Sequence, residues 1–118
     1  MSAGVAQANR FYEEVAETKV VWFGIYPDEV LLEFDVSDDN VSFPVWSSKS
    51  TIERLKKLNP NLLGNVEARG ISWDQFKEYF LPILPEDKKV VGVNLSGKNL
   101  TGIDIPASLL VKQVEAFW

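Results

Sequence analysis

The sequence of 118 residues contains no cysteine and no histidine. Without cysteine the chain has no disulfide and no thiolate zinc site, a composition typical of the reducing cytoplasm. Histidine is the commonest general base, a frequent zinc ligand and the usual pH switch, so its absence removes the commonest routes to catalysis. We therefore expect a cytoplasmic protein that is not an enzyme and that has no catalytic residue, no cofactor and no metal.

Long apolar runs and an excess of positive charge are also missing. No apolar run approaches the ~20 residues that a membrane-spanning helix needs, and residues 1–5 lack the basic segment and apolar core of a signal peptide. The 17 acidic and 12 basic residues give a formal net charge of −5, which disfavours a phosphate backbone as a partner. We expect neither a membrane nor a nucleic acid among the partners.

The spacing of the apolar residues predicts a single α+β domain over residues 1–118. Apolar residues with helical spacing predict helices over residues 5–17, after Ser50, after Ser72 and from Pro106 onward. Runs rich in β-branched and aromatic residues predict strands over residues 19–26, 30–36, 41–46, 66–71, 88–95 and 100–105. The order α-β-β-β-α-β-α-β-β-α describes about four helices packed on a small, mainly antiparallel sheet. Short turns between the first three strands predict an antiparallel meander.

Two helix starts have the spacing of a capping box, in which two side chains satisfy free backbone donors. The first pair is Ser50 and Glu53, and the second is Ser72 and Gln75. Both pairs come directly after a predicted strand, so the sequence predicts that the chain passes from sheet to helix at these two points.

The strand over residues 41–46 contains the candidate contact residues. Pro44 cannot donate to a strand ladder, so we expect this strand to lie at an edge of the sheet or to carry a bulge. Alternation directs Trp46 away from Phe43 and Val45, so either Trp46 faces a partner or a helix covers it. An open edge can pair with a strand of another chain. We predict a weak interaction surface of Pro44 and Trp46, with Trp118 as another candidate.

Catalytic and metal-binding alternatives have less support. Ser47 and Ser48 lack a histidine partner, and Lys49 is the nearest possible base, so we interpret both serines as structural residues between strand and helix. Residues 35–40 have clustered oxygens but lack the glycine and distant glutamate of a calcium loop, so they favour a hairpin turn. Basic side chains on the second helix favour a solvated face over a binding face: Lys49, Arg54, Lys56 and Lys57.

Several stretches together resemble a known family of small bacterial proteins. They are residues 9–15 (NRFYEEV), 21–24 (VWFG), 43–47 (FPVWS), 71–76 (ISWDQF), 80–82 (FLP) and 91–94 (VGVN). The family is catalogued as domain of unknown function 2750. The resemblance covers nearly the whole chain and implies a compact, single bacterial domain. No catalytic motif comes with it, so it assigns no active residue.

These observations favour a non-enzymatic domain for protein interaction or regulation, with a protein partner or a second copy of the chain. Two other functions stay open: an immunity-type protein that neutralises a toxin, and a small enzyme that uses carboxylate or lysine chemistry. Acidity and small size fit the first of these, and the second requires convergent side chains that the sequence alone does not reveal.

Overall fold

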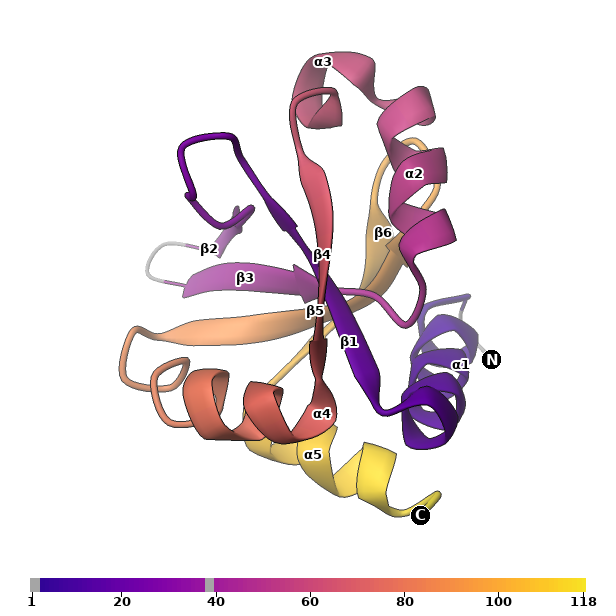
Figure 1. Ribbon diagram of the computed structural model, residues 1–118, viewed down its shortest axis with the longest axis vertical. Helices are drawn as coiled ribbons and strands as arrows, with labels where there is room; N and C mark the ends of the chain where they lie inside the picture. The colour runs from indigo at the N-terminus through magenta and orange to yellow at the C-terminus, as the bar shows by residue number, and fades with distance from the viewer. Residues whose placement is uncertain (1–2, 38–39) are drawn as a thin grey trace.

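The computed structural model describes residues 3–37 and 40–118, and it confirms the α+β fold (Figure 1). The helices are α1 (Ala3–Thr18), α2 (Lys49–Leu58), α3 (Pro60–Leu63), α4 (Trp73–Gln75), its π-helical continuation η1 (Phe76–Phe80) and α5 (Ala107–Glu115). The strands are β1 (Val20–Ile25), β2 (Phe34–Ser37), β3 (Asn40–Val45), β4 (Glu67–Ser72), β5 (Lys89–Ser96) and β6 (Thr101–Ile105). Within the described residues, no helix combines the length and apolar character needed to cross a bilayer.

The strands form a sheet of four and a separate ribbon of two. The four-stranded sheet has the order β2-β3-β5-β6, in which β3 and β5 are parallel and the other neighbours are antiparallel. The antiparallel β1–β4 ribbon crosses in front of this sheet (Figure 1). Two backbone hydrogen bonds join the ribbon to the end of β3: Trp22 N to Trp46 O at 2.9 Å and Trp46 N to Trp22 O at 2.8 Å.

The predicted three-strand meander is wrong, although its second half forms. β2 and β3 are an antiparallel pair, whereas β1 pairs with the distant β4. Among the described residues, the isolated bridge between Ile25 and Leu31 is the only strand pairing between β1 and the segment that follows it. The two faces of β1 enter different core clusters, so this strand needs cover on both sides. Residues 38–39 of the predicted hairpin turn, and of the less favoured calcium-loop alternative, lie outside the described residues.

β3 is an inner strand of the sheet, so the prediction of an edge strand at Pro44 is wrong. β2 pairs with β3 only as far as Ser42, and β5 pairs with β3 from Val41 to Val45. Pro44 therefore lies past the last residue that is paired with β2, where its missing N–H costs no ladder bond on that side.

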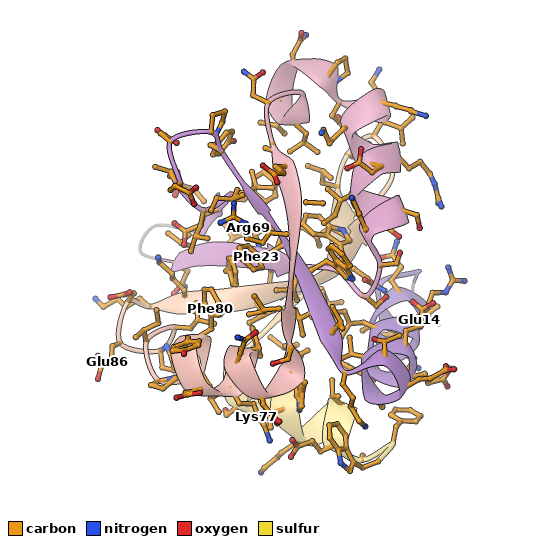
Figure 2. The ribbon with its side chains drawn as sticks, viewed as in Figure 1. Glu14, Phe23, Arg69, Lys77, Phe80 and Glu86 are labelled. Carbon is orange, nitrogen blue, oxygen red and sulfur yellow. The ribbon has the colours of Figure 1, made fainter. Side chains whose placement is uncertain are left out.

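Two clusters of buried side chains form the core on opposite sides of β3. The larger cluster contains Phe43 and Val45 and joins α1, β1, β5 and α5. The rings of Phe23 and Phe80, labelled in Figure 2, lie 5.7 Å apart within this part of the molecule. The smaller cluster contains Trp46 and is closed by residues of α2, α3 and β4. Alternation along β3 is thus as predicted, but both of its faces are buried.

The helix starts differ in how well the sequence predicted them. The capping box at Ser72 and Gln75 is confirmed, with both hydrogen bonds at 3.1 Å. The box predicted at Ser50 is wrong because α2 begins two residues earlier. Its N-cap is Ser48, which has extended backbone angles and accepts a hydrogen bond from Thr51 N at 3.4 Å. Both serines have a side chain suited to capping, so the sequence alone does not show which of them is the N-cap.

Candidate functional site

The candidate site lies where β3 and β5 end. Because these strands are parallel, their carboxyl ends meet at the same edge of the sheet, the place where open α/β sheets bind ligands. From this edge β3 leads into α2, while α1 packs against β5 and β6. Between α1, α2 and the end of β5 is a cavity that we call the polar pocket. Its polar lining residues are Gln7, Arg10, Thr51, Arg54, Asn94 and Ser96.

The polar pocket is small. Its volume is about 210 Å³, roughly seven times the ~30 Å³ that a water molecule occupies in the liquid. This is below the ~300–1,000 Å³ of pockets that enclose drug-sized ligands. The polar pocket is therefore suited to a single small group, such as a carboxylate or a phosphate with a few water molecules.

Asn94 holds the edge of the polar pocket together from an unusual backbone position. Its φ is +48°, in the left-handed region that asparagine tolerates better than most residues, and the β5–β6 register shifts between Val93 and Ser96. Bulges of this kind redirect a side chain next to a site. Asn94 is 7% exposed; its side-chain Oδ1 accepts from Ser47 N at 3.0 Å and its Nδ2 donates to Gln7 O at 3.2 Å. One side chain thus ties β5 to α1 and to the end of β3.

Ser47 and Ser48 have structural roles at this edge, as the sequence predicts. The Ser47 hydroxyl donates to Glu14 Oε1 at 2.5 Å and accepts from Asn94 Nδ2 at 3.2 Å. Glu14 lies on α1 and is labelled in Figure 2. Ser47 is buried and does not line the polar pocket, and Ser48 caps α2. Both hydroxyls are therefore occupied in positioning the walls of the polar pocket.

Arg10 of α1 and Arg54 of α2 contribute the charge of the polar pocket. Both side chains are exposed, and among the described residues neither forms an ion pair and no acidic side chain lines the polar pocket. This is unexpected in a chain with a net charge of −5. A guanidinium presents a planar set of donors that matches a carboxylate or phosphate in two parallel hydrogen bonds. The polar pocket is therefore chemically suited to an anion.

Gln7 has hydrogen-bonding capacity that the protein leaves unused. Its Nε2 donates to Ser96 Oγ, while its Oε1 is buried and has no partner among the described residues. A buried polar atom without a partner is uncommon in a folded protein. Because the two ends of an amide are interchangeable by rotation and the Ser96 hydroxyl can donate or accept, the free end can be either a donor or an acceptor. Gln7 therefore leaves one end of its amide unpaired in a residue that lines the polar pocket.

A family model described as "Protein of unknown function (DUF2750)" matches residues 8–114. The chain belongs to this family. No curated protein shows significant similarity to the chain. Of the polar lining residues, only Gln7 stands outside the matched range, by one position.

The DUF2750 chain does not present Trp46 or Pro44 at its surface. Trp46 is 1% exposed and its indole Nε1 donates to Leu95 O at 2.8 Å, and Pro44 is also buried. The prediction that these two residues form an interaction surface is therefore wrong, because the smaller core cluster covers that face of β3. The competing prediction, that a helix covers Trp46, is confirmed, because residues of α2 and α3 pack in the same cluster.

Trp118 is accessible in this DUF2750 protein. It is 60% exposed, and the ammonium group of Lys19 lies 3.3 Å from the centroid of its ring. Nothing among the described residues tests a contact between Trp118 and a partner, so that role stays a prediction.

The patterns in the DUF2750 sequence do not predict most of the polar pocket. Arg54 belongs to the predicted solvated basic face, Arg10 lies in one of the stretches that resemble the family, and no pattern assigns a role to Gln7 or Ser96. Asn94 offers the one local signal, since a polar residue that favours left-handed backbone ends an otherwise apolar strand. For metal binding, the described His, Cys, Asp and Glu residues form no group of three or more that could hold an ion.

Proposed function

We propose that this DUF2750 protein is a non-enzymatic regulatory domain that binds an anionic group in the polar pocket. The observation that carries the proposal is the pair Arg10 and Arg54, which come from two different helices, line one cavity and have no acidic partner among the described residues. An arginine that pairs with an acidic residue has its charge neutralised within the protein. Because these two arginines have no such partner among the described residues, their charge is available to a ligand.

The exposure of both arginines sets the expected strength of binding. A hydrogen bond to a charged group contributes about 1.5–3 kcal/mol when it is protected from water, and solvent and salt reduce that contribution at exposed sites. We expect dissociation constants on the order of 0.1–10 mM for a simple anion, from a net gain of about 3–5 kcal/mol. A natural ligand that adds contacts outside the polar pocket would bind more tightly.

The polar lining also supports the non-enzymatic part of the proposal. It consists of guanidinium, amide and hydroxyl groups, without a carboxylate or a lysine amine among the described residues. Guanidinium groups stay protonated and make poor general bases. Such a lining is suited to holding an anion and offers no group that would readily take a proton from it.

The test is a titration of the ¹⁵N-labelled protein with inorganic phosphate or acetate, followed by NMR, with chloride at the same ionic strength as the reference. We expect saturable shifts of the Thr51, Asn94 and Ser96 amides. Arg10→Gln and Arg54→Gln should each weaken phosphate binding at least about fivefold. The matched control is Lys112→Gln, an exposed charge on α5 that does not line the polar pocket.

Each outcome of this titration bears on the proposal. If phosphate binds equally to the wild type and to both arginine variants, or if all the charge variants including Lys112→Gln lose affinity equally, the polar pocket is not the anion site. If phosphate and acetate give no saturable shift beyond that of chloride, the proposed function is wrong.

Self-association is a second candidate function, favoured by the C-terminal segment. Three large apolar side chains in this segment are exposed: Leu109, Phe117 and Trp118. Exposed aromatic residues are enriched at protein interfaces. Sedimentation velocity at increasing concentration should show a dimer that Trp118→Ala weakens. A monomer at every concentration would contradict this candidate.

A further inference from the structure

A second cavity, distinct from the polar pocket, has a mainly apolar lining. We call it the apolar groove, and its apolar walls are Phe34 and Val36 of β2, Leu62 of α3, Leu95 of β5 and Leu100. Its volume is about 370 Å³, within the ~300–1,000 Å³ of small-molecule pockets. The two cavities share no lining residue. Along β5, for example, Leu95 lines the groove, whereas its neighbours Asn94 and Ser96 line the polar pocket.

The apolar groove exposes side chains that a core would normally cover. Leu62 is 48% exposed and Val36 is similarly exposed, although both belong to regular elements next to the core. Removing apolar surface from water is favourable roughly in proportion to the area removed. A ligand with an apolar part would therefore gain free energy by covering these two side chains.

One acidic residue faces the apolar groove, held by a bond across the sheet. Ser42 of β3 is buried and its hydroxyl donates to Asp104 Oδ1 of β6 at 2.6 Å, although β5 lies between these strands. Gly92 of β5 makes this contact possible, because a Cβ at this position would lie 2.7 Å from Ser42 Oγ and 3.2 Å from Asp104 Oδ1. The missing side chain at Gly92 therefore leaves room for the Asp104 carboxylate, which the hydrogen bond from Ser42 holds beside the apolar walls.

The Asp104 carboxylate has further capacity for a partner. Among the described residues it takes part in no ion pair, and its only side-chain hydrogen bond is the one from Ser42. A carboxylate next to apolar walls attracts a cation that brings an apolar group of its own. The complementary ligand therefore combines one positive charge with an apolar body.

We propose that the apolar groove binds a small ligand that carries one primary ammonium group on an apolar body. The ammonium group donates to Asp104, and the apolar body covers Leu62, Phe34 and Leu100. This ligand is opposite in charge to the one proposed for the polar pocket. Because the two cavities share no lining residue and take ligands of opposite charge, failure of one proposal leaves the other intact.

The test compares 2-phenylethylamine, which is protonated at pH 7, with 2-phenylethanol, its neutral counterpart, by NMR titration of the ¹⁵N-labelled protein. We expect the amine to bind at least about tenfold more tightly than the alcohol, a ratio that corresponds to about 1.4 kcal/mol. Both compounds should shift the amides of Leu100, Gly102 and Asp104, which belong to the apolar groove.

Two variants separate the roles of the charge and the walls. Asp104→Asn keeps an oxygen that can accept from Ser42, so it should fold; it should weaken the amine about tenfold and leave the alcohol within about twofold. Leu62→Ala changes a half-exposed side chain and should weaken both compounds about threefold or more. Asp87→Asn is the matched control for charge, because Asp87 is exposed and does not line the groove.

The result that supports the proposal is an amine preference that Asp104→Asn removes and Asp87→Asn preserves. Equal binding of amine and alcohol, or an amine preference that survives Asp104→Asn, would overturn it. So would the absence of saturable shifts at the groove amides at about 10 mM amine, since that affinity corresponds to less than about 3 kcal/mol.

Discussion

Replacement of Asn94 tests whether a strained backbone position and a buried side chain together hold the edge of the sheet. Asn94→Gly removes the bonds to Ser47 N and Gln7 O but keeps a residue that adopts a φ of +48° without steric cost. Asn94→Ala removes the same bonds and also places a Cβ in the left-handed region. Comparison of the two variants therefore separates the side-chain contribution from that of the backbone.

The two contributions have different sizes. Leaving buried polar groups without partners costs about 1–3 kcal/mol, so we expect this loss for Asn94→Gly. The left-handed conformation costs alanine about 1–2 kcal/mol more than glycine. The greater freedom of glycine in the unfolded chain offsets about 0.4–1 kcal/mol of that difference. Asn94→Ala should thus be about 1 kcal/mol less stable than Asn94→Gly.

The assay is urea denaturation followed by tryptophan fluorescence, together with thermal unfolding. For a chain of this size, 1 kcal/mol shifts the melting temperature by about 4 °C, so we expect decreases of about 4–12 °C for Asn94→Gly and about 8–16 °C for Asn94→Ala. The exposed Asn61→Ala serves as the control and should stay within about 0.5 kcal/mol of the wild type. If alanine at position 94 is as stable as glycine, or if both variants match the wild type, the reasoning is refuted.

Three further predictions concern other contacts of the fold. Trp46→Phe should lower the free energy of unfolding by at least about 1 kcal/mol in urea denaturation, because the buried Leu95 carbonyl loses its indole donor. The hydrogen bond from Lys77 holds the pKa of Glu115 below its ordinary value of 4.5, so this stabilisation is present above pH 4.5 and is lost as the pH falls through the lowered value. Glu115→Gln should therefore flatten the dependence of the unfolding free energy on pH below 4.5, and an unchanged slope would contradict the assignment. Ser72→Ala should destabilise the protein by about 1 kcal/mol in thermal unfolding, with Ser72→Thr restoring most of the loss; equal stability of both variants would argue against the cap.

The proposed functions depend on positions that the chain brings together from far apart. Asn94 Nδ2 and Gln7 O, which form a hydrogen bond, are separated by 87 residues in the sequence. Ser42 and Asp104 are separated by 62 residues and meet only because Gly92 lies between them. No local pattern contains either pair, so neither cavity was predicted from the sequence.

Local patterns were sufficient wherever the interactions are local. The order of helices and strands follows from apolar periodicity, and the capping box of Ser72 and Gln75 involves residues only three apart. The direction of Trp46, away from Phe43, follows from the two-residue period of a strand. The absence of cysteine and histidine limits the available chemistry regardless of the fold.

Tertiary structure decided which strands pair and what covers each face. β1 pairs with β4 instead of β2, and Trp46 is buried under α2, α3 and β4 instead of facing a partner. Strand pairing and burial depend on contacts between segments that are far apart in the sequence. A pattern of neighbouring residues therefore does not show which of these contacts is most favourable. The same reason explains why Arg10 and Arg54 have no apparent function as separate residues in the sequence and line one cavity, the proposed anion site, only when two helices bring them together.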